Sequence, residues 1–110
     1  MTELKEWLES KGFKIYDNPI ASQYNQEKWY AAKRTSSKRE CTSNKKPVQI
    51  VVNPYTTTMR HGIHESITVD ITAEWAGIWW RLESYSLRPG EFKKKFTQIE
   101  KRLVKAWEAL

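Results

Sequence analysis

The sequence predicts a single α+β domain in which about five antiparallel strands form one sheet, with an N-terminal helix and a longer C-terminal helix on one face. Three observations favour this fold. The length of 110 residues suits one domain, expected to span residues 1–110. Residues 66–87 alternate apolar and polar side chains as strands do, and residues 89–110 repeat apolar side chains at helical spacing. The predicted element order is α-β-β-β-β-β-α.

A short helix is predicted at residues 2–11, where Leu4, Trp7 and Leu8 fall on one face. Gly12 is placed to end this helix in a left-handed conformation. The strands that follow are bounded by polar, turn-forming residues. They are predicted at residues 13–16, 27–34, 47–53, 66–75 and 78–87.

The strongest pattern in the chain is a hairpin at residues 66–87 with a two-residue turn at its centre. Alternation pairs Ala73 with Trp80 and Ile71 with Leu82, so that a small side chain faces a large one on the core side. A slip of one residue would move every apolar side chain to the other face. We therefore expect Trp80 to be buried in the core.

The outward face of the same hairpin combines acidic and aromatic side chains. The register places Asp70 opposite Glu83 and diagonal to Arg81, which predicts a surface charge network or, alternatively, a shared proton or a bound cation. Trp79 and Tyr85 are expected on this face as well. They predict either contact with another element or partner, or flat stacking surfaces for bases.

The net charge of +6 is concentrated in residues 33–46, the basic segment. Six basic residues and one acidic residue give this segment +5, and the rest of the chain carries +1. Its serine, threonine and asparagine side chains add neutral donors for a phosphate backbone. The alternative is a loop between two strands that is only solvated. In either case we expect the segment to be mobile. The basic residues of the segment are Lys33, Arg34, Lys38, Arg39, Lys45 and Lys46.

The helix predicted at residues 89–110 has one apolar stripe and a basic opposite face. Lys94, Lys101 and Lys105 lie on that basic face and are expected to assist the basic segment in binding nucleic acid. The alternative is that these lysines only keep the protein soluble.

Composition disfavours several classes of protein and site. The one cysteine, Cys41, excludes an intrachain disulfide, and no Cys/His framework for zinc is present. Without a membrane-length apolar run or a signal-peptide pattern, we expect a cytoplasmic protein with no membrane contact. His61 and His64 fall in residues 53–66, an expected irregular connection, which disfavours a metal site. No cofactor, metal ligand or catalytic residue is predicted.

These observations favour a non-enzymatic nucleic-acid-binding module that uses the basic segment and the basic helix face, with weak sequence specificity. The alternative is a protein-interaction or inhibitor module. It would act on an acidic protein partner or as a homodimer, through the aromatic sheet face or the C-terminal helix. The protein is thus expected to be a monomer or a homodimer. A weaker alternative is a small metal-dependent nuclease or hydrolase built on Asp70, Glu83 and His64.

Overall fold

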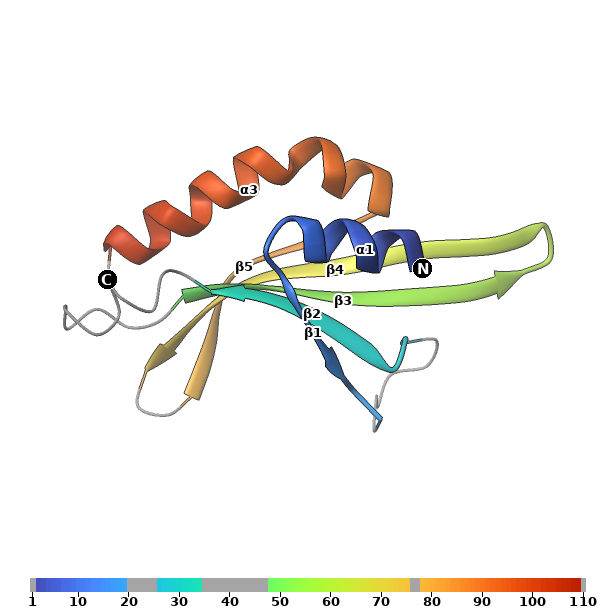
Figure 1. Ribbon diagram of the computed structural model, residues 1–110, viewed down its shortest axis with the longest axis horizontal. Coiled ribbons are helices and arrows are strands. Elements are labelled where there is room, and N and C mark those ends of the chain that lie inside the picture. The colour runs from blue at the N-terminus through green and yellow to red at the C-terminus, as the bar shows by residue number, and fades with distance from the viewer. Residues whose placement is uncertain (1, 20–25, 35–47, 76–77, 110) are drawn as a thin grey trace.

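The computed structural model describes residues 2–19, 26–34, 48–75 and 78–109, apart from the side chains of Trp75, Trp107 and Ala109. The turn predicted at residues 76–77 and the mobility predicted for the basic segment beyond residue 34 lie outside the described residues. The described elements form one sheet with helices on one side of it (Figure 1). The predicted α+β fold is confirmed.

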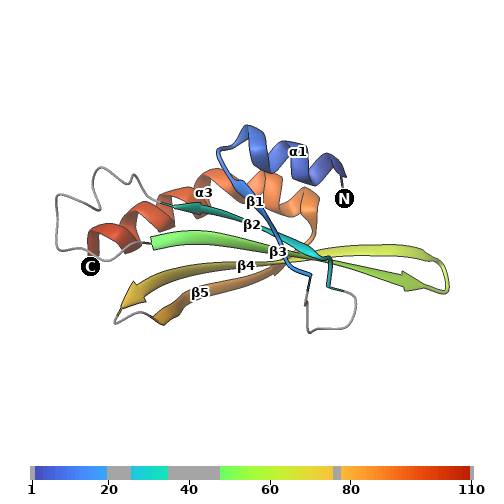
Figure 2. The ribbon, with the colours of Figure 1, turned by 60° about the horizontal axis from the view of Figure 1, so that its bottom comes forward.

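Two helices and five strands build the domain, in the predicted order. Each strand pairs antiparallel with its neighbours along the chain, so the sheet order is β1-β2-β3-β4-β5 (Figure 2). Both helices cover the same face, and no described helix covers the other one, the open face. The elements are α1 (Thr2–Ser10), β1 (Lys14–Asp17), β2 (Trp29–Arg34), β3 (Val48–Met59), β4 (Gly62–Trp75), β5 (Ile78–Leu87) and α3 (Pro89–Ala109).

Helix α1 ends as its sequence predicts. Gly12 adopts a positive φ of 90°, a conformation that other residues rarely take. The N–H of Phe13 donates to the carbonyl of Leu8 at 3.0 Å, and the N–H of Gly12 donates to that of Glu9 at 3.1 Å. These two bonds satisfy carbonyl groups at the helix end and turn the chain directly into β1.

An aromatic cluster joins the two helices above the sheet. Phe92, which is fully buried, and Phe96 lie on the inner stripe of α3. The Trp7 ring of α1 meets both edge-on, with centroid separations of 5.6 and 5.3 Å. Phe13 lies 6.4 Å from Phe92 by the same measure. Such edge-to-face pairs add to the free energy gained by burying the rings, so this cluster holds α1 and α3 together.

The β3–β4 hairpin is much longer than predicted and projects beyond the helices (Figure 1). Residues 53–66 were expected to be irregular, but they continue both strands in register up to Met59 and Gly62. That prediction is wrong. β-Branched threonines favour extended strands, and Gly62 takes a positive φ of 131° beside the turn.

Pro54 lies inside β3 opposite Ile67, although the sequence predicts that this strand ends before it. Its carbonyl accepts a hydrogen bond from the N–H of Glu27 at 3.0 Å, just before β2 begins at Trp29. The N–H that proline lacks would have pointed to this same side. A proline is tolerated there because the regular β2 ladder has not yet started.

Strands β4 and β5 pair as predicted near their turn, but a bulge at Leu82 changes the register beyond it. Ala73 lies opposite Trp80, as expected, whereas Ile71 lies opposite Glu83 and not opposite Leu82. Leu82 has no partner in β4, so every later side chain of β5 takes the face opposite to the predicted one. The alternation within β5 did not reveal this extra residue.

Trp80 is not buried, and that prediction is wrong. The residue lies on the helix side of the sheet, opposite the buried Ala73, but 49% of its surface is exposed. Figure 1 shows that the tip of the β4–β5 hairpin turns away from α3. Alternation therefore predicted the correct face for Trp80 but not whether a helix covers that part of the face.

Candidate nucleic-acid interface

The first two residues of the basic segment end strand β2 and point to opposite faces of the sheet. Lys33 lies on the helix side, where it forms an ion pair with Glu100 of α3. Its ammonium group also lies 5.5 Å from the centroid of the Phe96 ring. Lys33 therefore links β2 to α3, and only 27% of its side chain is exposed. The segment's other lysines and arginines, after Arg34, and Cys41 lie outside the described residues.

Arg34 lies on the open face and covers an aromatic ring from another strand. Its guanidinium carbon is 5.0 Å from the centroid of the Trp79 ring, and its Nε donates to Oε1 of Gln49 at 3.3 Å. Arg34 is exposed and Trp79 is half-buried. An arginine stacked on an indole presents positive charge next to a π surface, a combination that proteins use to hold nucleic-acid strands.

The open face also contains an ion pair between Arg81 and Asp70, with Nε 3.4 Å from Oδ1. Asp70 is only 8% exposed, and its Oδ1 and the hydroxyl of Thr72 form no hydrogen bond with the described residues. Because of the bulge, Asp70 lies opposite Ser84 and not opposite Glu83. The predicted pair of opposed carboxylates is therefore absent. Of the two interpretations, the contact with Arg81 supports a charge network.

Glu83 and Tyr85 lie on the helix side, although the predicted register placed both on the outward face. The Tyr85 hydroxyl donates a hydrogen bond to Glu83. The two carboxylate oxygens of Glu83 also lie 3.1 and 3.2 Å from Nη1 of Arg102 in α3. The bond from Tyr85 is the largest influence that lowers the pKa of Glu83, and Arg102 adds to it. Tyr85 thus connects β5 to α3 rather than offering an open stacking surface beside Trp79.

This contact predicts acid-sensitive stability. Because the folded state lowers the pKa of Glu83, its contribution to stability is complete above the ordinary value of 4.5 and is lost as the pH falls through the lowered value. The variant Glu83→Gln should therefore show a smaller loss of unfolding free energy on acidification. Urea denaturation at neutral and acidic pH measures the effect. The control Glu6→Gln, at an exposed position of α1, should keep the wild-type pH dependence.

The three lysines predicted on the outer face of α3 are all exposed, as their helical spacing requires. Lys94, Lys101 and Lys105 are separated by seven and four residues, so they form a row on the side away from the sheet. At 1.5 Å per residue the row is about 16 Å long. Several phosphates of one strand could contact a row of that length.

The ends of these basic elements meet at one end of the molecule. Strand β2 ends at Arg34, β3 begins at Val48, and both lie at the same end as the C-terminal turns of α3 (Figures 1 and 2). The ion pair between Lys33 and Glu100 joins β2 to α3 next to Lys101. The described residues on either side of residues 35–47, Arg34 and Val48, therefore lie at the end of the molecule where α3 finishes, with Arg34 on the open face of the sheet. We call this region, formed by the end of β2, the start of β3 and the C-terminal turns of α3, the basic end.

The two histidines lie at the opposite side of the molecule. His61 and His64 are exposed in the β3–β4 hairpin, and His64 is six residues from Asp70 along β4, a distance of about 20 Å. Asp70 and Glu83 face opposite sides of the sheet. The residues suggested for a nuclease are thus not brought together. Within the described ranges, no three side chains of the metal-ligating types cluster.

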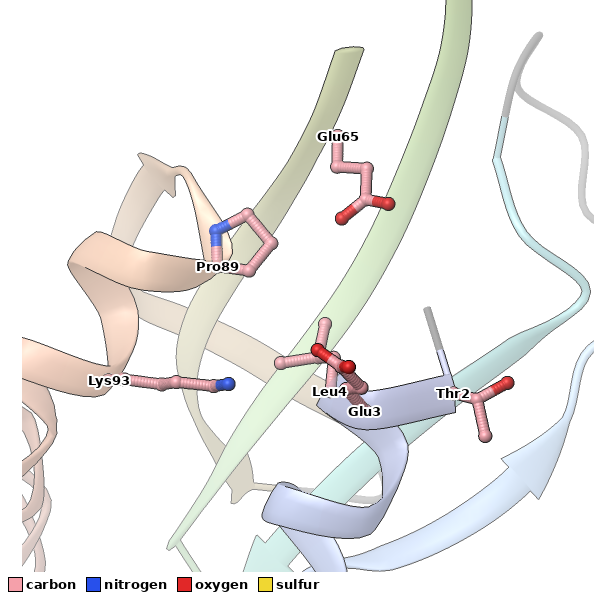
Figure 3. Close-up of a pocket in the computed structure, with 6 residues that line it drawn as sticks. All are labelled: Thr2, Glu3, Leu4, Glu65, Pro89 and Lys93. Carbon is pink, nitrogen blue, oxygen red and sulfur yellow. The ribbon is translucent and has the colours of Figure 1, made fainter. Parts of the chain in front are cut away.

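A hollow of about 330 Å³ opens between the start of α1, β4 and the start of α3 (Figure 3). Lys93 extends from α3 toward α1, where Glu3 lies, and Glu65 reaches in from β4. These three side chains are exposed, and their charges sum to −1. The negative sum of these charges makes the hollow unsuitable for phosphate. The hollow also lies away from the basic end. It is lined by Thr2, Glu3, Leu4, Glu65, Pro89 and Lys93.

The sequence did not predict the contacts of two arginines in this region. Arg81 was assigned only to a charge network, although it shares the open face with Trp79, and Arg102 was not assigned a partner. A bulge has no reliable signature in β5, so the contact between Arg102 and Glu83 could not be anticipated. The stack of Arg34 on Trp79 joins residues far apart in sequence, which only strand order brings together.

Comparisons of the chain with known protein families, curated proteins and solved structures find no match. No helix in the described parts of the chain is both long and apolar enough to cross a membrane.

Proposed function

We propose that the protein binds nucleic acid at the basic end, without catalysing a reaction. The observation that carries the proposal is the junction of Lys33 with Glu100, which joins the anchor of the basic segment to the basic helix face. From this junction we infer that the basic segment continues beside the basic helix face and that the two form one surface. A concentrated positive field of this kind attracts a phosphate backbone and speeds the encounter with it.

The charges at the basic end are unequally neutralised, and this favours an anionic ligand. Glu100 and Glu83, the acidic side chains under α3, are each engaged by a cation, Lys33 or Arg102. Lys101 and Lys105 remain exposed on the outer side of the same helix. The pair with Lys33 cancels one negative charge of α3 and the pair with Glu83 cancels one positive charge, so the net charge of α3 is unchanged. A ligand would meet the exposed lysines of its outer side.

Binding by these groups would be mainly electrostatic and weakly selective for sequence. Lysine side chains contact phosphates, which are the same at every position of a strand. Arg34 stacked on Trp79 adds a site where an unpaired base could lie against the exposed guanidinium. The combination favours single strands or strand ends over sequence-specific reading of a groove.

The test is a titration of tryptophan fluorescence with single- and double-stranded DNA and RNA at two salt concentrations. The triple variant Lys94→Gln, Lys101→Gln, Lys105→Gln should bind duplex DNA more weakly. Its dependence of log affinity on log salt should be shallower by about 0.9 for each phosphate that the protein no longer neutralises. The variant should fold normally, because all three side chains are exposed.

A matched control removes the same charge elsewhere. Lys28, Arg60 and Arg88 are exposed and lie before β2, at the β3–β4 turn and before α3, away from the basic end. Changing these three to Gln should leave the salt dependence at its wild-type value. If both triple variants weaken binding equally, the ligand senses only net charge, and the proposed surface is wrong.

A protein-interaction or inhibitor module is the second candidate. The observation that favours it is the row of exposed apolar side chains on β5, formed by Ile78, Trp80 and Leu82. Apolar side chains gathered on one strand are typical of interaction surfaces. Binding through this row would persist at high salt, whereas electrostatic binding to nucleic acid would not.

A further inference from the structure

Strand β5 is an edge of the sheet whose outer side is apolar near the hairpin turn. Within the described sheet it pairs only with β4. Ile78, Trp80 and Leu82 alternate along it and are 56%, 49% and 44% exposed. Ile78 and Trp80 pair with Trp75 and Ala73 and lie on the helix side, where the hairpin tip turns away from α3 (Figure 1), and the bulge residue Leu82 follows them. An edge strand with unpaired backbone groups and apolar side chains is a template for another strand.

The other edge of the sheet is protected in the ways that edge strands commonly are. Strand β1 has only four residues, and it begins with Lys14 and ends with Asp17, both exposed. Short strands and charged side chains discourage pairing with another chain. No such charge interrupts the apolar row of β5 on its own face, so the two edges differ in what they can bind.

We propose that the protein forms a two-fold symmetric homodimer in which residues 78–82 of β5 pair antiparallel with the same residues of a second copy. The two-fold axis passes between the two Trp80 residues. In this register Ile78 lies opposite Leu82 of the second copy, and Trp79 lies opposite Arg81 of the second copy. The two sheets then continue into one another, with the helices of both copies on the same side.

The side chains of this segment are complementary to themselves in that register. On the helix side, Ile78 and Leu82 of one copy meet Leu82 and Ile78 of the other, and all four lose exposed apolar surface. On the open face, each Trp79 ring meets a guanidinium from Arg81, whose side chain is 65% exposed. Both faces are therefore matched by one symmetry operation.

The backbone agrees with the same axis. Trp75 and Ile78 are paired across a two-residue connection, which makes them a hydrogen-bonded pair in an antiparallel hairpin. The pattern alternates, so the N–H and C=O groups of Trp79 and Arg81 point to the free edge. An axis at Trp80 brings Trp79 of each copy opposite Arg81 of the other, and these are the residues whose backbone groups are available.

The bulge at Leu82 limits the pairing. The residue after it, Glu83, faces the helix side and is held by Tyr85 and Arg102, so the strand beyond does not continue the same register. Because both copies use the same edge, the contact closes on itself and leaves no equivalent site for a third copy. The expected assembly is therefore a dimer and not a filament.

The inference goes beyond the proposed function and is independent of it. The tip of the β4–β5 hairpin lies at the same end of the molecule as the basic end (Figure 2). A dimer would bring two basic ends near one another, which would strengthen binding to a long strand. Self-association can nevertheless be measured with no nucleic acid present, so either idea can fail while the other stands.

Sedimentation velocity over a range of protein concentrations tests the dimer. The wild type should shift from monomer to dimer as concentration rises. Ile78→Glu and Leu82→Lys should each raise the dimer dissociation constant by at least about tenfold, because each places a charge against an apolar side chain. Mixing the two variants should restore a dimer, because the register then sets the new carboxylate opposite the new ammonium once in each heterodimer.

Matched controls use Ile63, which is 69% exposed at the distant β3–β4 tip. Ile63→Glu and Ile63→Lys should both dimerise as the wild type does. A wild type that stays monomeric at every concentration would overturn the proposal. Single variants that dimerise normally would also overturn it. Failure of the mixed variants to associate would exclude the axis at Trp80.

A covalent test does not depend on the charged variants. In a Cys41→Ser chain, Trp80→Cys should form an intermolecular disulfide under mild oxidation, since residues on the axis lie within bonding distance across a non-hydrogen-bonded pair. The control Cys41→Ser with Ile63→Cys should stay monomeric. Equal cross-linking of both chains would indicate random collision and count against the proposed dimer.

Discussion

Replacing Phe92 by alanine is expected to lower the free energy of unfolding by about 3–5 kcal/mol. The Phe92 ring is fully buried and lies edge-on to Trp7, Phe13 and Phe96. Removing it leaves a cavity at the point where α1, α3 and the sheet meet, and the surrounding rings cannot collapse fully into that space. Since small domains are stable by about 5–15 kcal/mol, the variant should lose a large fraction of its stability.

Urea denaturation followed by tryptophan fluorescence measures this effect. Val104→Ala is the matched control, because Val104 lies on the same helix but is 47% exposed. Its unfolding free energy should change by less than about 0.5 kcal/mol. Equal losses in the two variants would show that α3 is held to the sheet in another way than through its aromatic stripe.

Removing the charge of the basic segment is expected to cause the largest loss of nucleic-acid binding. The quadruple variant Lys38→Ser, Arg39→Ser, Lys45→Ser, Lys46→Ser removes four of the 19 basic residues of the chain. If each contacts a phosphate, the salt slope of duplex binding should fall by up to about 3.6. Affinity for different sequences should fall about equally, because phosphates carry no base information. Fluorescence titration at several salt concentrations gives both quantities.

A charge-conserving control separates electrostatics from specific geometry. The variant Lys38→Arg, Arg39→Lys, Lys45→Arg, Lys46→Arg keeps every positive charge and should retain the wild-type salt slope. If the wild type shows no salt-dependent binding to any nucleic acid, the electrostatic proposal fails. The protein-interaction candidate then becomes the better explanation of the basic segment, with an acidic protein as its partner.

Local signals predicted the elements whose ends are marked by specific residues. The spacing of Leu4 and Leu8 defined the buried face of α1, and Gly12 marked its end. Phe92, Phe96, Ile99 and Leu103 recur at helical spacing, and all are buried under α3. In both helices the side chains that repeat are the ones that pack, so periodicity and burial agree.

The hairpin shows where the same reasoning fails. Pairing of Ala73 with Trp80 followed from alternation counted from the turn, and it is correct. The extra residue at Leu82 then reversed the faces of Glu83 and Tyr85, which removed the predicted carboxylate pair and brought both residues to Arg102. A bulge depends on the twist of the sheet and on the side chains that pack against the strand. The alternation of apolar and polar residues within one strand indicates neither of them.

The candidate interface divides in the same way. The sequence alone located the excess of charge, since counting shows that residues 33–46 carry +5 of the net +6. It also predicted that Lys94, Lys101 and Lys105 share one helix face. It could not predict that Lys33 would turn inward to Glu100, because that contact joins residues 67 positions apart.

The sequence by itself thus determined the fold class, the face that each helix buries and the places where positive charge accumulates. All of these follow from interactions between residues a few positions apart, which have a fixed spacing in helices and strands. Only the tertiary structure decided that Trp79 would lie under Arg34, that Trp80 would be left half-exposed, and that Lys33 would pair with Glu100 of α3. Those outcomes depend on strand order, on the bulge and on where α3 stops covering the sheet. Each of these outcomes is determined by packing between segments that are distant in sequence. Such packing produces no repeating pattern of residues from which it could be predicted.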